Sequence, residues 1–378
     1  MSLPTAYAAG VGILVAVLLL SVSDASAYRR YGRSRPMAAH AVTGPQRSAK
    51  GPLQIVISIS SQRLLVYDKL GLLATSTVST GVGGYPTPTG VFSVLDKEWQ
   101  HHSNIYGGAS MPFMQRLTMS GVALHSGMVT GRPASHGCIR LPHAFAIKLF
   151  HLTTLGARVV IAANEPTPAE ISHARLFVHN PPLSIGAEQA RRDAASPAGI
   201  ALASALELEK GFVDARLGKV SAERWQMLEA MPISVFVSAM EGKVFVRHGF
   251  RPLFEAPAVI RDPERPLGTH IYTALEFKDD THTNMRWHVL SMPPESENAQ
   301  ARSRKISRAS LSADAGMPLA AHAPPATAAE ALERFDLPQD ALDRISELLS
   351  PGASLIVSDH GFNREMRAAG TDFIVLTR

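Results

Sequence analysis

The chain is organised around residues 122–142, VALHSGMVTGRPASHGCIRLP, which hold the only cysteine of its 378 residues. Cys138 lies close to two histidines, His125 and His136. A thiol becomes a nucleophile when a neighbouring base or cation favours its thiolate form. Small polar residues surround this cysteine, whereas a structural cysteine is usually embedded in an apolar run. We therefore interpret Cys138 as a functional residue.

The composition describes a folded protein with more than one domain. The chain exceeds the usual length of a single domain, and 46% of its residues are hydrophobic. Its formal net charge is +5, but the basic residues are scattered and form no recognised nucleic-acid motif. We expect no nucleic-acid partner. The positive charge instead fits an anionic surface such as a cell wall or anionic lipid.

The N-terminus has the pattern of an export signal. An apolar run over residues 8–22 ends in Ala25, Ser26 and Ala27, which predicts a signal peptide over residues 1–27, its cleavage, and a periplasmic protein. Arginines follow the run and none precedes it, so an uncleaved inner-membrane anchor facing the periplasm is the alternative. A lone cysteine cannot form an internal disulfide after export, which favours a functional role for it.

Residues 52–163 have the pattern of a mainly β catalytic domain with few helices. The preceding residues 28–51 lack periodicity and predict a flexible tether. Pro142 to Gly156 indicates a helix, and apolar alternation indicates strands. The expected strands are 53–60, 64–68, 72–80, 91–95, 117–124 and 158–162.

Residues 96–115 are expected to form a solvated or substrate-facing loop. The neighbouring His101 and His102 raise the question of a metal site, but the HExxH pattern of zinc enzymes is absent. We expect no metal and no organic cofactor.

The remaining residues predict a helical connector followed by a second, degenerate copy of the same fold. The connector covers residues 164–230, with a helix at 201–212, and the second copy covers residues 231–378. The strand pattern at 56–67 recurs at 234–247. An insert at about 293–330 is rich in Ser, Ala and Pro and is expected to be disordered.

The late part of the two copies aligns with a constant offset. Leu337-Pro338 precedes Gly352 by the same spacing that separates Leu141-Pro142 from Gly156. The offset of 196 places Arg334 at the position of Cys138 and Leu332 at that of His136. The second copy would therefore lack both the nucleophile and this histidine, and we expect it to serve a structural or substrate-guiding role.

The segment Ser135-His136-Gly137-Cys138-Ile139-Arg140, with His125 upstream, resembles the L,D-transpeptidase (YkuD-like) family. Pro88-Thr89-Gly90-Val91-Phe92 and Met111-Pro112-Phe113 support the resemblance, which covers about residues 53–162 and implies a β-sandwich or barrel. Two features depart from the family pattern. The loop 126–134 is short, and Leu141-Pro142 follows the arginine where a polar residue is common.

The resemblance implies roles for individual residues. Cys138 would be the nucleophile and His125 the general base and acid, while His136 would line the site and orient the thiolate. Arg140 could hold a substrate carboxylate or, equally, form an ion pair that fixes the loop. The residues expected to contact substrate are Arg140, Ser135, Gly137 and Tyr106.

The implied reaction is acyl transfer at peptidoglycan stem peptides. Cys138 would attack the L,D bond of a tetrapeptide stem, and an amine would then resolve the thioester to form a wall crosslink. Resolution by water would make the protein an L,D-carboxypeptidase, and a protein amine would attach the wall to an outer-membrane protein. A non-catalytic peptidoglycan-binding module is the alternative from another class.

Overall fold

The structure, a computed structural model, describes residues 47–180, 222–292, 324–366 and 370–377. Within these ranges no helix combines the length and the apolar character that a membrane span requires. The expected signal peptide at residues 1–27 and the expected helix at residues 201–212 lie outside the described residues.

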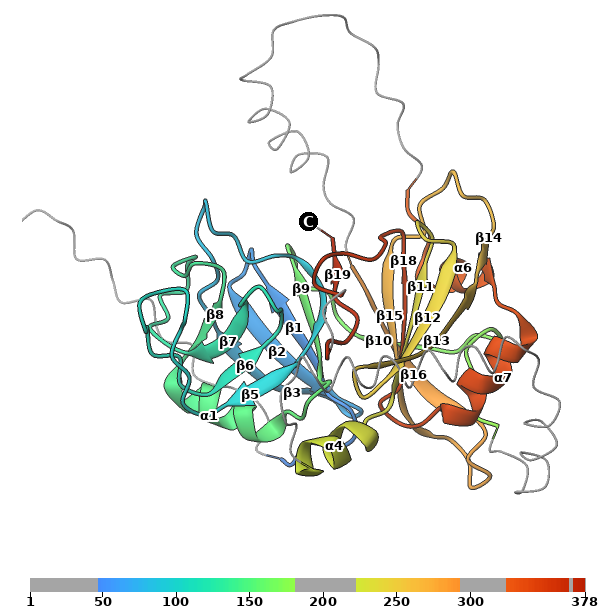
Figure 1. The fold of residues 1–378 in the computed structure, drawn as a ribbon, viewed down its shortest axis with the longest axis horizontal. Helices are drawn as coiled ribbons and strands as arrows, with labels where there is room; N and C mark the ends of the chain where they lie inside the picture. The colour runs from blue at the N-terminus through green and yellow to red at the C-terminus, as the bar shows by residue number, and fades with distance from the viewer. Residues whose placement is uncertain (1–46, 181–221, 293–323, 367–369, 378) are drawn as a thin grey trace, which may run out of the picture. The chain divides into compact units, whose positions relative to one another are not determined.

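The first lobe (residues 47–163) contains a six-stranded sheet in the order β19-β4-β9-β1-β2-β3 (Figure 1). Strand β1 pairs in parallel with β9, and the other pairs are antiparallel. The strands are β1 (Gln54–Ser58), β2 (Arg63–Asp68), β3 (Gly71–Thr77), β4 (Gly90–Ser93), β9 (Arg158–Ala162) and β19 (Val375–Leu376). The end of the expected tether contacts this sheet, because Arg47 forms an ion pair with Asp68.

A four-stranded sheet, in the order β5-β6-β7-β8, carries the central motif of the sequence. Helix α1 (His143–Leu152) follows it and begins directly after Pro142, whose φ of −56° suits a helix start. The strands are β5 (Asp96–Glu98), β6 (Met114–Arg116), β7 (Ala123–Ser126) and β8 (Ile139–Leu141).

Two sequence expectations about this sheet are wrong. The expected loop at 96–115 contains β5 and most of β6. The expected strand at 117–124 is interrupted by a turn over residues 118–121, where the Thr118 hydroxyl accepts a hydrogen bond from the Val122 amide and Gly121 has a φ of +105°. A side-chain hydrogen bond of this kind competes with the strand ladder.

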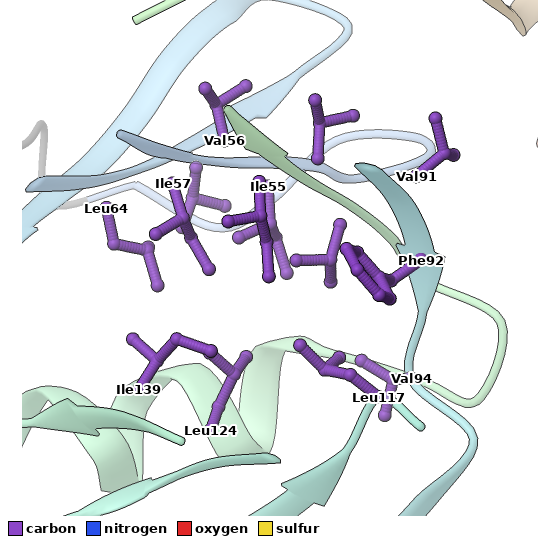
Figure 2. Packing of buried hydrophobic residues seen from close by; sticks show 14 of the residues in the cluster. Ile55, Val56, Ile57, Leu64, Val91, Phe92, Val94, Leu117, Leu124 and Ile139 are labelled. Atoms are coloured by element: carbon purple, nitrogen blue, oxygen red, sulfur yellow. The ribbon is translucent and has the colours of Figure 1, made fainter. Parts of the chain in front are cut away.

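The core of the first lobe lies between its two sheets. In Figure 2, Ile55 and Phe92 point from the larger sheet towards Leu124 and Ile139 on the smaller one, whereas Val56 points to the opposite face. All five side chains are fully buried. Each contributes about 1.5–3 kcal/mol of transfer free energy, so this core holds the smaller sheet in place.

The second lobe (residues 231–362, together with β10) is built on a seven-stranded sheet in the order β10-β16-β15-β18-β11-β12-β13. Strand β10 belongs to the expected helical connector, so that expectation is wrong at this point; the nearby α4 (Ala222–Glu229) is helical. The sheet strands are β10 (Ala169–Ile171), β11 (Ile233–Ser238), β12 (Lys243–His248), β13 (Arg251–Pro257), β15 (Thr269–Phe277), β16 (Met285–Ser291) and β18 (Ser354–Ser358).

Two helices and a small ladder complete the second lobe. Helix α6 (Ala328–Glu333) begins inside the expected disordered insert, where Thr327 and Glu330 form a capping box; residues 293–323 of that insert lie outside the described residues. Strands β14 (Val259–Ile260) and β17 (Phe335–Asp336) pair with each other. Helix α7 (Gln339–Leu348) follows Pro338.

The two lobes share the same connectivity of strands and helix. In each, a strand pairs in antiparallel with the next strand and in parallel with the strand that follows a proline-capped helix. Helix α7 and strand β18 begin and end 196 residues after α1 and β9. This agreement supports a duplicated fold, which stays a prediction.

The C-terminal segment (residues 363–377) joins the sheet of the first lobe. Strand β19 pairs with β4, and the side chains of residues 373–375 are fully buried. Asp372 forms a buried ion pair with Arg158 at 3.0 Å, and Arg158 also donates to the hydroxyls of Ser234 and Ser354. The last residues of the chain therefore belong structurally to the first lobe.

Candidate active site

Two paired strands bring the segments that hold Cys138 and His125 side by side. Strands β7 and β8 are parallel, with His125 opposite Arg140. Cys138 directly precedes β8, two residues before Arg140, whose backbone lies opposite that of His125. Cys138 is partly buried. The pairing of β7 with β8 therefore brings the backbone segments of Cys138 and His125 close together, and their catalytic pairing stays a prediction.

The backbone of residues 121–123 surrounds the thiol of Cys138. Its Sγ donates to the carbonyl oxygen of Gly121 at 3.5 Å and packs beside Met111 and Met114. Burial raises the pKa of Cys138, while the Ala123 amide and the charge of Arg140 act in the opposite direction. The resting form of the site is therefore the neutral thiol.

The imidazole of His125 is oriented by a backbone carbonyl. Its Nδ1 donates to the carbonyl oxygen of Ser126 at 2.8 Å, which leaves Nε2 as the acceptor of the neutral ring. Burial lowers the pKa of His125, the hydrogen bond to Ser126 acts in the opposite direction, and Arg140 and His101 lower it further. A neutral imidazole can accept a proton from a thiol. Sequence reasoning missed the Ser126 carbonyl because a backbone contact leaves no residue-type signal.

The loop before Cys138 is fixed by internal hydrogen bonds. The Ser135 hydroxyl donates to the Cys138 carbonyl at 2.5 Å and accepts from the Gly137 amide at 3.2 Å. The hydroxyl of Thr87, which sequence reasoning missed, donates to the Gly137 carbonyl at 2.8 Å. Gly137 has a φ of +109°, a conformation that other residues rarely adopt. Direct substrate contacts by Ser135 and Gly137 stay a prediction.

His136 lies on the exposed rim of the site, between two tyrosines. Its ring centroid is 4.7 Å from that of Tyr85 and 5.2 Å from that of Tyr106. The Tyr106 hydroxyl donates to the His136 carbonyl at 3.5 Å. Both tyrosines are about half exposed, at 54% and 45%. Tyr106 and His136 are therefore placed where a substrate could meet them; sequence reasoning missed Tyr85, which follows a glycine-rich turn.

Arg140 supplies positive charge without a carboxylate neighbour. None of the ion pairs formed by the described residues involves it, and its aliphatic part lies against Gly127. The ion-pair role considered for Arg140 is thus not seen in the described part of the chain. No group of three or more metal-ligating side chains is found among the described residues.

This arrangement matches a known catalytic domain. Residues 52–161 match the family model YkuD, described as the L,D-transpeptidase catalytic domain. The match confirms the resemblance noted in the sequence, and it covers the six-residue motif, His125 and both sheets of the first lobe except β19. The second lobe lies outside it.

Three solved structures are similar to part of the chain. An L,D-transpeptidase from Stackebrandtia nassauensis is 26% identical, with a TM-score of 0.28, over 31% of this chain and 58% of that chain. An L,D-transpeptidase from Mycobacterium smegmatis is 24% identical, with a TM-score of 0.28, over 30% of this chain and 59% of that chain. L,D-transpeptidase 1 of Mycobacterium tuberculosis is 30% identical, with a TM-score of 0.26, over 29% of this chain and 62% of that chain. The chain spans about three fifths of these proteins. A comparison with curated protein sequences gave no match.

Proposed function

We propose that the protein is an exported cysteine acyltransferase that cleaves the L,D bond of a peptidoglycan tetrapeptide stem and passes the acyl group to an amine. The observation that supports this proposal is the pairing of β7 with β8, which brings the segment of the partly buried Cys138 close to that of His125, whose imidazole is oriented by the Ser126 carbonyl. The family match over residues 52–161 supports the same reaction class.

The chemistry begins from a neutral pair. As substrate binds, His125 Nε2 takes the proton from Cys138 Sγ, and the sulfur forms a bond with the carbonyl carbon of the stem peptide. The C–N bond then breaks, and the leaving amine of the terminal D-residue takes that proton from His125. The product of this half-reaction is a Cys138 thioester.

The second half-reaction mirrors the first. An acceptor amine attacks the thioester carbon and gives its proton to Nε2 of His125. The C–S bond breaks, and the proton returns to Cys138 Sγ. Amine attack forms a wall crosslink, whereas attack by water trims the stem. The Ser126 carbonyl supports both halves, because it stabilises the imidazolium that forms each time.

Arg140 and the two tyrosines account for substrate selection. A stem peptide ends in a carboxylate, and the guanidinium of Arg140 can bind it with two parallel hydrogen bonds. The tyrosines at the rim offer flat apolar surfaces to the peptide or the attached sugar. The proposed partners are donor and acceptor stem peptides in the periplasm, with an outer-membrane protein amine as a possible acceptor.

Product analysis tests this proposal. The purified protein is incubated with tetrapeptide muropeptides, with and without an acceptor amine, and the products are separated and weighed. We expect dimers joined through the amine, and none with Cys138→Ala. Tripeptides alone would identify a carboxypeptidase, and no turnover together with retained wall binding would identify a non-catalytic module.

A further inference from the structure

A carboxylate from the C-terminal segment holds the turn that contacts the nucleophile. Glu365 Oε2 accepts hydrogen bonds from the backbone amides of Met119 at 2.7 Å and Ser120 at 3.2 Å. Charge-assisted bonds to two successive amides fix both the position and the orientation of a turn. These residues are separated by about 245 positions in the chain.

The same turn provides the immediate surroundings of the thiol. Gly121, which follows Ser120 directly, accepts the hydrogen bond from Cys138 Sγ through its carbonyl oxygen. Within the turn, the Thr118 hydroxyl contacts the Ser120 hydroxyl at 3.0 Å and accepts from the Val122 amide at 2.9 Å. A shift of the turn therefore moves the backbone that touches the sulfur.

Glu365 lies in a frame of hydrogen bonds. The Asn363 carboxamide accepts from the Glu365 amide at 2.9 Å and donates to the Ile374 carbonyl at 2.5 Å. The guanidinium of Arg247 donates to the Met366 carbonyl at 2.9 Å, and Met366 is buried. The frame connects the second lobe, through Arg247, to the fully buried Ile374 beside the sheet of the first lobe.

We propose that Glu365 is a positioning residue for Cys138, supplied by the C-terminal segment and acting through the 118–121 turn. It touches neither substrate nor the reacting atoms. Its role is to keep the Gly121 carbonyl and the Ala123 amide at the sulfur, so that the thiol stays aligned with His125. This inference rests on the proposed cysteine chemistry, but it makes a separate claim about which part of the chain prepares the thiol.

Acylation kinetics provide the first test. In Glu365→Ala, we expect the maximal rate of Cys138 acylation by a carbapenem to fall about tenfold, with the half-saturating concentration unchanged within about twofold, because misalignment slows chemistry more than binding. Glu365→Gln keeps an acceptor oxygen and should restore most of the rate. Glu241→Ala is the matched control, because Glu241 accepts from the Phe362 amide at 3.0 Å without touching the turn.

Two further measurements keep the inference separate from the proposed reaction. Hydrogen exchange of the peptide covering residues 117–124 should accelerate in Glu365→Ala and stay unchanged in Glu241→Ala. Alkylation by iodoacetamide reports Cys138 alone, because the chain has one cysteine, and its rate should change only in Glu365→Ala. Wild-type exchange and alkylation in that variant would overturn the positioning role, even if wild-type protein fails to acylate.

Discussion

Under the predicted duplication, the two lobes place very different residues at corresponding positions. In the first lobe, Cys138 follows a glycine loop and its thiol is partly exposed. In the second lobe, Arg334 occupies the position shifted by 196, directly after helix α6, and is 6% exposed. Its guanidinium donates to the carbonyls of Arg261, Asp262, Arg265 and Pro266. The first lobe thus has a thiol at this position of the predicted alignment, and the second has a buried guanidinium.

The backbone pairing next to these two positions is also similar. Ser79 forms an isolated bridge with Arg140, and Val259 pairs with Asp336 in the equivalent way. The adjoining loop is tied by the hydroxyl of Thr87 in the first lobe, whereas four carbonyls on one guanidinium tie it in the second. Hydrogen bonds therefore hold this loop in both lobes, but only the first lobe has a cysteine next to it. We expect reactivity to need the thiol and the imidazole in addition to the fixed loop.

The sharpest test of this contrast compares one histidine from each lobe. His125→Ala should lower acylation by about 10²–10⁴-fold, because the general base is lost, with folding retained. His270 is 4% exposed and bonds to Ser291, Leu267 and Ala326. His270→Ala should instead cost about 1–3 kcal/mol of unfolding free energy and leave acylation unchanged. Adduct formation measures acylation, and urea unfolding measures stability, in both variants. An equal loss of acylation in His125→Ala and His270→Ala would refute the difference expected between the two lobes.

The next largest effect concerns the ion pair that joins the C-terminal segment to the first lobe. Asp372→Ala leaves the guanidinium of Arg158 buried and unpaired, so we expect a loss of about 3–5 kcal/mol in the free energy of unfolding. Urea unfolding followed by tryptophan fluorescence measures it. The double variant Arg158→Met/Asp372→Ala is the control and should recover part of the loss. A single variant as stable as wild type would argue against the segment's structural role.

Substitution of Arg334 should lower stability by a smaller amount and leave acylation unchanged. Arg334→Ala removes the buried guanidinium that donates to four backbone carbonyls and should cost about 1–3 kcal/mol of stability. Acylation of Cys138 should not change, because the two sites share no residue. Arg334→Cys should show no second adduct by intact mass, since both ring nitrogens of the buried His270 are already hydrogen-bonded. A second adduct would show that the scaffold alone activates a thiol.

The smallest expected effect is a shift in pH dependence. Since burial raises the pKa of Cys138, its alkylation by iodoacetamide should have its midpoint above that of a free cysteine in the same buffer. Arg140 lowers the pKa of this thiol through its charge, so Arg140→Met should move the midpoint to still higher pH. Arg132→Met, which alters an exposed arginine of the preceding loop, is the control. A midpoint that falls in Arg140→Met would contradict this electrostatic picture.

Short sequence patterns predicted the elements whose structure depends on neighbouring residues. Alternation at 53–60 and the proline before 143 correspond to β1 and α1, and the cysteine motif led to His125 and Cys138. The turn at 118–121 was missed because its alternating residues resemble a strand. Contacts between distant residues, such as Arg158 with Asp372, have no signature within either segment. The tie between the C-terminal segment and the first lobe could therefore be found only in the structure.

The central claim is that Cys138 alone forms the acyl-enzyme. Intact-mass spectrometry of the full chain after incubation with a carbapenem tests it most directly. The account predicts one covalent adduct on wild-type protein, mapped to the peptide containing Cys138, and none on Cys138→Ala. An adduct that survives this substitution, or a wild-type protein that stays unmodified while iodoacetamide still alkylates it, would contradict the account.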